Sequence, residues 1–342
     1  MEMVTFTIIV DDIVYPDGHS AMACLGGGGP QTAFGAKLWF SDNERVGLAA
    51  GIGADFPESC RTWLEETGID THGLLQWPLS TLRAWQILEG DGRRTQVWRM
   101  AVGDEVWGML RPEMSALPLP YQKAKVYHAG VHPSGRDVDF IRGLRDTGAE
   151  IVSIEVYTHA EDIVSRTELQ DLVSSGHIFS PNEREAVSLV GPGPPLELIE
   201  RLSELGAEVV VLRRGPLGCI KCVNRSDTKE TWEVPAFHTL FGHQEKAHDE
   251  TSAKEEPTLR IKGVNVKKIL DPTGCGNTFC GGFLAGWYKT HDLLTAALWG
   301  SIAASFMLEY EGVPPLPMSQ WKAEAQLRLE LLHPHAMKLR FA

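Results

Sequence analysis

The sequence predicts an α/β fold with a central, mainly parallel sheet that helices cover on both faces. From about residue 125 onward, short apolar segments that suit strands alternate with longer segments that suit helices. The expected strands are Lys125–Ala129, Ile151–Val156, His177–Phe179 and Val209–Leu212, and the expected helices are Asp137–Thr147, Glu183–Leu189 and Pro195–Leu205. Strands and helices that alternate at this spacing are typical of parallel sheets.

The N-terminal part of the chain begins the same pattern. Phe6–Val10 and Val46–Ile52 are apolar runs that suit strands, and the small-residue segment Thr32–Trp39 between them suits a helix. At 342 residues, the chain is long enough for one large α/β domain. We therefore expect a single domain over residues 1–342.

A β-hairpin is expected farther along this half of the chain. Thr81–Leu88 and Thr95–Met100 suit extended strands, and the polar turn between them contains Asp91-Gly92. An Asp-Gly pair supplies the positive φ that a tight hairpin turn requires.

Bulk composition excludes several classes of function. The chain has 32 Lys and Arg against 45 Asp and Glu, a formal net charge of −13. Binding to nucleic acid or to an anionic membrane needs clustered positive charge, so neither is expected. The first ten residues lack the features of a secretory signal, and no segment reaches the roughly 18 apolar residues of a membrane span. We therefore expect a cytoplasmic protein.

Residues 238–260 interrupt the alternating pattern, because they are polar, charged and without period. We expect a surface insertion there, and a docking role for it stays open. His238, His243 and His248 lie five residues apart, which does not place them on one helical face. We interpret them as solvated loop histidines rather than as metal ligands.

The densest signal is a glycine-rich turn between an expected strand, Val264–Leu270, and an apolar helix through Trp287. The turn reads Asp-Pro-Thr-Gly-Cys-Gly-Asn from Asp271 to Asn277. The first N–H groups of a helix have no partner within the helix, and the helix dipole favours an anion there. The turn therefore indicates an anion site, although a plain strand-to-helix connection has the same pattern.

This string resembles the second signature of the PfkB/ribokinase family, Asp-Thr-x-Gly-Ala-Gly-Asp. Other elements of the family follow in order along most of the chain. They are Gly26-Gly27 to Ala33, which resembles Gly-Gly-x-x-x-Asn-x-Ala with Gln31 for Asn, the turn Gly51–Phe56, the Asn-x-x-Glu motif Asn182–Glu185, and the strand and turn Val209–Gly218. The resemblance implies a ribokinase-like fold with a small β-lid, formed by about residues 10–20 and 80–101.

The resemblance also implies a kinase that uses ATP and Mg²⁺. Gly274, Cys275 and Gly276 would form the anion hole for the transferred phosphoryl group. Asn182 and Glu185 would act on Mg²⁺ through water, with Glu185 as the metal residue.

On the nucleotide side, the resemblance implicates Gly215 and Gly218, which turn towards the phosphates. Arg213 and Arg214 precede that turn, and a guanidinium there could pair with a nucleotide phosphate; of the two, we assign Arg214 to the site. The family position of Asp271 serves structure and metal-bound water.

On the substrate side, Asp12 matches the carboxylate that binds substrate hydroxyls, and a turn cap is its alternative interpretation. Gly27, Gly28 and Gln31 would line the substrate pocket. The acceptor would be a sugar, a sugar phosphate or a nucleoside. A homodimer through the lid strands is a further expectation from related folds.

Asn277 departs from the family, because its position belongs to the catalytic Asp. That carboxylate takes the proton from the attacking hydroxyl, and a neutral amide can only orient the hydroxyl by hydrogen bonding. Loss of a general base typically costs about 10²–10⁴-fold in rate. Pro272 and Cys275 also replace the common Thr and Ala, so the substitution belongs to a divergent branch.

Three interpretations follow from this departure. The protein is a kinase that manages with a substitute base or without one. Alternatively, it is a pseudokinase that binds a nucleotide or sugar phosphate in a regulatory or scaffolding role. In the third, the site runs other chemistry through Cys275, whose thiol at a helix N-terminus should have a lowered pKa.

Overall fold

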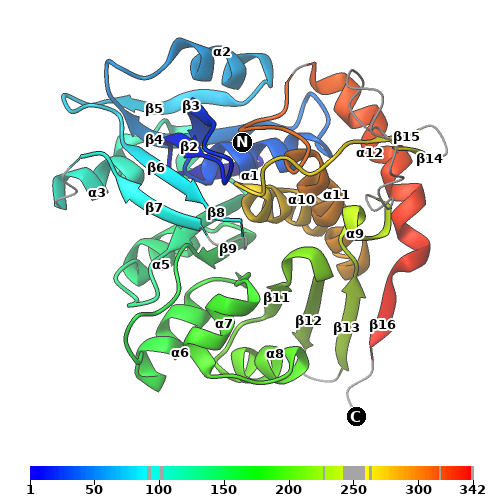
Figure 1. Cartoon of the computed structure of the whole chain (residues 1–342). Helices are drawn as coiled ribbons and strands as arrows, with labels where there is room; N and C mark the ends of the chain where they lie inside the picture. The colour runs from blue at the N-terminus through cyan, green and yellow to red at the C-terminus, as the bar shows by residue number, and fades with distance from the viewer. Residues whose placement is uncertain are drawn as a thin grey trace.

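The computed structural model describes residues 1–90, 94–100, 104–225, 228–241, 259–261, 264–315 and 317–339. Within that part, one large sheet has the strand order β16-β13-β12-β11-β10-β9-β8-β1-β4-β5 (Figure 1). Its strands are β1 Met3–Phe6, β4 Val46–Ile52, β5 Asp70–Gln76, β8 Val126–Val131, β9 Ile151–Val156, β10 Ile178–Phe179, β11 Val209–Arg213, β12 Cys219–Arg225, β13 Thr228–Val234 and β16 Met337–Leu339. The pairs from β5 to β11 are parallel, and β12, β13 and β16 continue the sheet in antiparallel pairing.

Helices cover both faces of this sheet, which confirms the predicted α/β architecture (Figure 1). Their bounds are α1 Gly29–Lys37, α2 Glu58–Glu66, α3 Asp104–Leu110, α4 Leu119–Gln122, α5 Val138–Asp146, α6 Arg166–Ser175, α7 Glu183–Val190, α8 Pro195–Glu204, α9 Phe237–Phe241, α10 Cys275–Thr290, α11 Leu293–Met307 and α12 Met318–Leu332. Alternate strand residues enter two apolar cores, one shared with α1, α2, α10, α11 and α12 and the other with α5 to α8. This alternation follows from the two-residue period of a strand.

A second sheet has the order β3-β2-β6-β7 and corresponds in position to the expected lid. Its strands are β2 Ile9–Val14, β3 Ser20–Gly26, β6 Arg83–Leu88 and β7 Arg94–Trp98. The predicted hairpin is confirmed, since β6 and β7 pair antiparallel; residues 91–93 of its turn lie outside the described residues. β3 was not expected, and it carries this sheet up to the glycine segment.

The strand expected over Phe6–Val10 is in fact two strands. Thr7 has a φ of 81°, which ends β1 in the large sheet and lets β2 begin in the small one. A positive φ at a β-branched residue is uncommon, and the apolar run gives no signal of it.

The strand expected over Val264–Leu270 is also shorter than predicted. β15 covers Val264–Val266 and pairs with β14, Leu259–Ile261, in a separate two-stranded sheet. The N–H groups of Leu270 and Asp271 both donate to the Leu308 carbonyl at the end of α11. The segment before the glycine-rich turn is therefore anchored to a helix end rather than to a neighbouring strand.

The expected insertion begins later than residue 238, because Phe237–Phe241 form α9. His238 is 3% exposed, and its Nε2 lies 3.0 Å from Glu309 Oε1, so the interpretation of a solvated loop histidine is wrong for this residue. His243, His248 and the remainder of 242–258 lie outside the described residues. No described helix combines the length and the apolar character that crossing a bilayer requires.

Several helices were not predicted from the sequence, among them α2, α6, α11 and α12. α6 begins after Ser165, whose side chain accepts a hydrogen bond from the Glu168 N–H while Glu168 accepts one from the Ser165 N–H. This reciprocal pair is a capping box, and Ser-x-x-Glu before an apolar segment is its readable signal.

Candidate active site

The amino end of α10 lies where the glycine-rich turn meets α1. Gly274 is in the left-handed conformation, and a side chain there would lie 2.7 Å from Gln31 Cγ. Gln31 is buried in α1, and its Nε2 donates to the Leu25 carbonyl. Within the described part of the chain, its buried Oε1 has no hydrogen-bond partner. Gln31, predicted for the substrate pocket, thus lies against Gly274, predicted for the anion hole, and an unused acceptor lies beside the turn.

The glycine segment after β3 approaches the same turn. Gly27 and Gly28 have φ values of 94° and 88°, and a side chain on Gly28 would lie 2.9 Å from Asn277 Nδ2. Only a glycine combines that φ with so close an approach without strain. The structure therefore brings two segments together that the sequence predicted as one site.

Asn277 is held by a residue that sequence reasoning missed. Its Nδ2 donates a short hydrogen bond to Oε1 of Glu155, at the carboxyl end of β9. Glu155 is 4% exposed, and its other oxygen lies 2.8 Å from Arg213 Nη2. Burial opposes ionisation of Glu155, but the Arg213 charge and the hydrogen bonds from His128 and Asn277 outweigh it and lower its pKa to about 2.

Other polar groups complete this buried cluster. His128 Nε2 lies 3.5 Å from Glu155 Oε1, and Cys280 Sγ lies 3.7 Å from Oε2. His128, Glu155 and Cys280 have the side-chain types of a metal site. The guanidinium of Arg213 already neutralises this carboxylate, which disfavours a cation at the same place.

Of the two arginines considered from the sequence, Arg213 and not Arg214 lies against the start of α10, where the anion site is predicted. Its guanidinium pairs with the Glu155 carboxylate and donates a hydrogen bond to the Ser180 carbonyl at 2.8 Å. A side chain on Gly276 would overlap Arg213 Nη1, so the guanidinium rests against the first turn of α10. Arg214 instead pairs with Glu233 at 2.8 Å and lies 3.7 Å from Glu183. Neighbouring residues leave a strand in opposite directions, and the apolar pattern could not tell which arginine turns inwards.

The Asn-x-x-Glu motif forms the start of α7. Asn182 Oδ1 accepts from the Glu185 N–H at 2.9 Å, while the Asn182 N–H and Nδ2 donate to the Glu185 carboxylate at 2.7 and 2.6 Å. Burial raises the pKa of Glu185 to about 7 against the lowering effect of the Arg213 charge. Arg213 Nη2 lies 3.5 Å from Glu185 Oε2, which links this motif to the end of α10.

The surroundings of the Glu185 carboxylate oxygens can be compared with what the expected magnesium site requires. Both carboxylate oxygens of Glu185 are used by Asn182, so only their remaining lone pairs are open to a further partner. That arrangement fits contact with Mg²⁺ through water, since Mg²⁺ keeps part of its hydration shell. A nearby cation would also favour the ionised form of a carboxyl whose pKa burial has raised.

The two aspartates of β2 lie on opposite faces of the small sheet. Asp12 is fully buried, accepts from the Ala23 N–H at 2.9 Å, and pairs with Arg83 at 3.1 Å and with Arg99. Asp11 faces the glycine segment instead, because a side chain on Gly26 would overlap its carboxylate. Asp11 is therefore the aspartate of β2 that contacts the glycine segment, whereas Asp12, the residue predicted from the sequence, is paired with Arg83 and Arg99.

Asp11 has a distinctive environment. Gln86 Nε2 donates to its Oδ1 at 2.8 Å. Burial raises its pKa to about 6, against the lowering effects of Gln86 and the Arg94 charge. The Arg94 charge also opposes the rise in pKa that burial causes at Glu185 and at Cys275.

The remaining predicted residues have structural surroundings. Asp271 is fully buried and accepts hydrogen bonds from Tyr15 Oη at 3.2 Å, the Thr273 N–H at 2.8 Å and the Gly312 N–H at 3.4 Å. It therefore ties the glycine-rich turn to two other loops. The expected lowering of the Cys275 pKa is wrong, because burial raises it.

The turn after β11 contains the other two predicted nucleotide residues. Gly215 and Gly218 flank the short helical turn Gly215–Leu217, and a side chain on Gly218 would overlap the Val234 carbonyl of β13. The space around Gly215 is open. Gly218 thus has a packing requirement of its own, while Gly215 remains available to a ligand.

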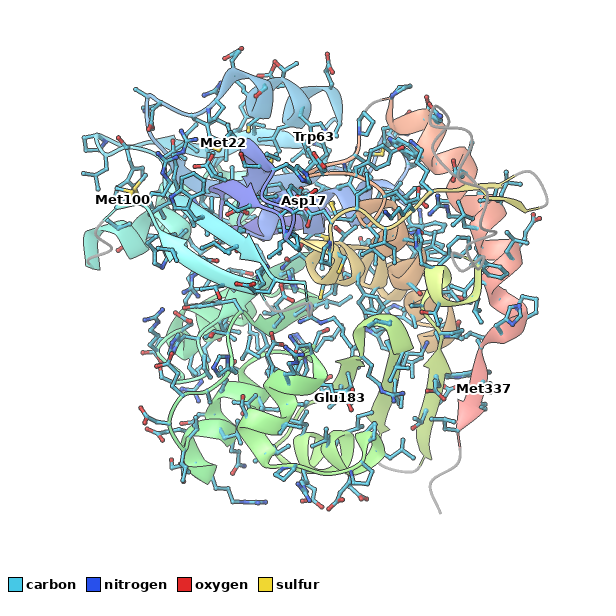
Figure 2. All side chains as sticks on the ribbon, viewed as in Figure 1. Asp17, Met22, Trp63, Met100, Glu183 and Met337 are labelled. Carbon is cyan, nitrogen blue, oxygen red and sulfur yellow. The ribbon has the colours of Figure 1, made fainter. Side chains whose placement is uncertain are left out.

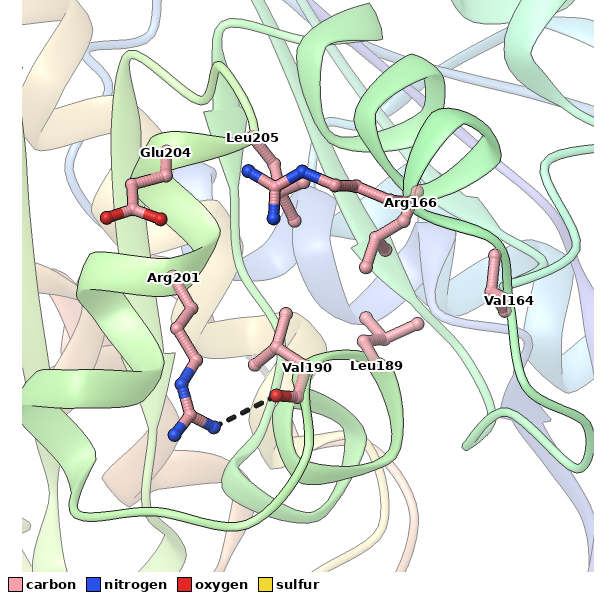
Figure 3. Close-up of a pocket in the computed structure, with 8 residues that line it drawn as sticks. Val164, Arg166, Leu189, Val190, Arg201, Glu204 and Leu205 are labelled. Carbon is pink, nitrogen blue, oxygen red and sulfur yellow. Dashed lines mark hydrogen bonds between the residues drawn. The ribbon is translucent and has the colours of Figure 1, made fainter.

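A separate pocket lies between α6, α7 and α8, away from the residues described above (Figure 3). It has a volume of about 230 Å³ and combines aliphatic side chains, Leu189 among them, with Arg166 and Arg201. Arg201 is already committed to the Val190 carbonyl, at 3.0 Å, and to Glu197. Among its lining residues, the pocket has no arginine beside a glycine-lined helix start of the kind found at α10.

The described site has the features of a phosphotransferase: a glycine-lined helix start, a buried arginine against it, and carboxylates on both sides. The model of the pfkB family carbohydrate kinases matches residues 16–240 and 248–319. The chain therefore belongs to the pfkB carbohydrate kinase family, which confirms the resemblance noted from the motifs.

Curated relatives include a cytidine kinase of Thermococcus kodakarensis, which is 28% identical over 291 residues that cover 84% of this chain and 88% of the relative. Protein MAK32 of Saccharomyces cerevisiae is 30% identical over 169 residues, which cover 46% of this chain and 39% of that protein.

Solved structures confirm the ribokinase-like fold. The nucleoside kinase of Methanocaldococcus jannaschii is 19% identical with a TM-score of 0.62, over 97% of this chain and 99% of that one. The ribokinase of Giardia lamblia is 18% identical with a TM-score of 0.67, over 96% and 98% of the two chains.

Proposed function

We propose that this protein transfers a phosphoryl group from ATP, with Mg²⁺, to a hydroxyl of a small nucleoside-, sugar- or sugar-phosphate-like molecule. The observation that carries the proposal is the meeting of three elements at one place. The start of α10 at Gly276, the guanidinium of Arg213 and the amide of Asn277 lie together beside the glycine segment at Gly28. A helix start with an arginine binds a phosphoryl group, and the adjacent amide can orient a hydroxyl.

In this proposal the anion hole is formed by the backbone of Gly274, Cys275 and Gly276. These groups stabilise the charge on the transferred phosphoryl group. Mg²⁺ would be held through water by Glu185, with Asn182 fixing that carboxylate, and would neutralise charge on the nucleotide phosphates.

The acceptor would lie along the glycine segment. Gly27, Gly28 and the unused oxygen of Gln31 line that side. Asp11 is the carboxylate best placed to bind an acceptor hydroxyl, while Asp12, paired with two arginines, would stabilise the small sheet from its other face. The curated cytidine kinase and the nucleoside kinase structures support a nucleoside as the first acceptor class to test.

Asn277 sets the chemistry of the proposed reaction. An amide does not accept a proton at neutral pH, so it orients the hydroxyl without removing its proton. Phosphoryl transfer passes through a loose transition state and depends mainly on positioning and electrostatics. We therefore expect turnover that is slow by about 10²–10⁴-fold relative to a site with a general base.

One observation supports a second candidate function, that of a binding module without catalysis. The Asn277 amide is engaged by Glu155, so the residue at the base position is fixed within the fold. A pseudokinase would keep the nucleotide site and lose turnover.

Calorimetry tests the binding on which both candidates depend. Purified protein is titrated with ATP in the presence and absence of Mg²⁺, and then with individual nucleosides and sugars. We expect ATP to bind more tightly with Mg²⁺, and one acceptor class to bind. A protein that binds neither ATP nor any acceptor would contradict both candidates.

A further inference from the structure

We propose that Glu155 is the positioning residue for Asn277: it binds the amide nitrogen and thereby turns Asn277 Oδ1 towards the acceptor hydroxyl. The inference rests on the proposed phosphoryl transfer and adds a residue to it. It also explains how a chain without the usual aspartate can keep a defined hydrogen-bond acceptor at the reacting hydroxyl.

The contact determines which way the amide faces. A side-chain amide has two N–H donors on one atom and an acceptor oxygen on the other. Asn277 Nδ2 donates to Glu155, and the reversed amide would place its oxygen against a carboxylate oxygen. Two acceptor oxygens in contact repel each other, so the amide nitrogen of Asn277 must face Glu155.

The oxygen of the amide is left open. Among the described residues none donates to Asn277 Oδ1, and this atom is not one of the buried polar atoms that lack a partner. Oδ1 also lies farther than Nδ2 from the side-chain position of Gly28, at 3.8 Å against 2.9 Å. The Asn277 nitrogen is therefore the amide atom nearer both Glu155 and the Gly28 position, and the oxygen is the atom that keeps its lone pairs open to a further donor.

Glu155 is fixed strongly enough to act as a positioning group. It is 4% exposed at the carboxyl end of β9, and Arg213 holds its second oxygen at 2.8 Å. His128 approaches the first oxygen at 3.5 Å and is itself placed by Ser153 at 3.1 Å. A carboxylate held from two sides in the sheet cannot follow the amide if the amide rotates.

Replacing Asn277 by the aspartate that is usual in the family should therefore not raise kcat unless Glu155 is changed as well. Asn277→Asp puts a second carboxylate against Glu155, and two carboxylates that share a site cannot both be ionised without strong repulsion. The exchange needs a partner change, Glu155→Gln, whose amide can donate to the new carboxylate. The structure thus predicts that the residues at 155 and 277 depend on each other.

A double-mutant cycle tests this dependence. Wild type, Glu155→Gln, Asn277→Asp and the double variant are compared for kcat and KM towards the acceptor identified by calorimetry, and for urea unfolding. We expect each single change to lower kcat by about 10–100-fold, since small misplacements at a reacting centre cost that much. We expect KM for ATP to stay within about twofold, and the double variant to exceed both single variants in kcat.

Glu309→Gln is the matched control. Glu309 is also a buried carboxylate paired with an arginine, at 2.9 Å from Arg328, but it lies outside the proposed site. It should lose stability without a comparable loss of kcat. If Glu155→Gln does not fold, Glu155→Asp keeps the charge opposite Arg213 and withdraws the oxygen from Asn277, with the same expected loss of kcat.

Two results would overturn the inference. One is an Asn277→Asp variant that alone exceeds wild type in kcat, and the other is a cycle in which the two changes are additive. Binding of ATP without any turnover in wild type would instead contradict the proposed function. In that case urea unfolding of the four proteins tests whether residues 155 and 277 depend on each other. If they do, Asn277→Asp is less stable than the double variant. Additive changes in the free energy of unfolding would contradict the dependence.

Discussion

The guanidinium of Arg213 lies between Glu155 and Glu185 and against Gly276 in the first turn of α10. The sequence indicated an arginine near the nucleotide phosphates but not which of two neighbours turns inwards. The same uncertainty applied to Asp11 and Asp12. Asp11 and Asp12 are adjacent on a strand, and Arg213 ends one with Arg214 directly after it, so the side that each residue faces depends on how the sheets pack.

Removing the Arg213 charge should weaken the fold as well as the site. Arg213→Met leaves Glu155 without its close cation, and breaking a buried pair from one side costs about 3–5 kcal/mol. Arg214→Met should cost no more than about 1 kcal/mol, because its partners Glu183 and Glu233 are partly exposed. Urea unfolding of both variants measures the difference, and equal losses would refute the assignment.

Lys221 gives a stability prediction outside the site. It is fully buried on β12, its Nζ has no partner within the described residues, and burial lowers its pKa from 10.5 to about 8. Between pH 8 and 10.5 the unfolded chain binds a proton that the folded chain has released, so stability rises with pH across this window.

Lys221→Met should remove the free-energy cost of burying this lysine. The shift corresponds to about 3 kcal/mol, which the variant should gain near pH 7. The gain should shrink as the pH rises, and it should vanish only above pH 10.5, where the wild-type lysine is neutral in both the folded and the unfolded state. Thermal unfolding at pH 7 and pH 9.5 measures it, and a variant that is less stable than wild type at pH 7 would refute the account of this residue.

At the scale of elements, the sequence predicted the helices with apolar periodicity well, including α5, α7 and α8. It did not predict the break at Thr7 or the short β15, because both depend on contacts that are remote in sequence. The glycine-rich start of α10 was identified from its composition. The reason for glycines farther along that helix is visible only in the structure.

Gly281 allows α10 to pack closely on α1. A side chain there would overlap the Thr32 carbonyl, which is backbone and cannot move aside easily. Gly281→Ala should therefore destabilise the protein by about 1–3 kcal/mol. Gly143→Ala is the matched control in α5, since open space surrounds that position and Ala is the better helix former by about 0.5–1 kcal/mol. Urea unfolding in which both substitutions have the same sign would contradict the close packing.

At the scale of the whole molecule, the α/β class, the parallel centre of the large sheet and the hairpin of the small sheet were predicted, but the outer strands β5, β12, β13 and β16 and the covering helices α2, α11 and α12 were not. The close approach of Gly28, Asn277 and Glu155 was not, because these residues come from three separated segments that the fold brings together. Asn277 was recognised as the departure from the family, but its partner could be found only in three dimensions.

We expect the small sheet to form the interface of a homodimer. Met22 of β3 is 52% exposed, and Val97 of β7 is 44% exposed, so both outer strands present apolar side chains. Met22→Glu should shift the sedimentation profile towards monomer. Met337→Glu is the control, because Met337 is equally exposed at 55% but lies on β16, far from Met22 (Figure 2). A monomeric wild type, or a loss of dimer only with Met337→Glu, would contradict this interface.

Phosphoryl transfer is tested by following the labelled γ-phosphate of ATP to an acceptor in a single turnover of the wild-type protein. Nucleosides and sugars that bind in calorimetry serve as acceptors, with Mg²⁺ present. We expect a slow but complete appearance of label in the acceptor, with Asn277 in place. ATP that binds and keeps its label in the presence of every acceptor would contradict phosphoryl transfer and leave the protein as a binding module.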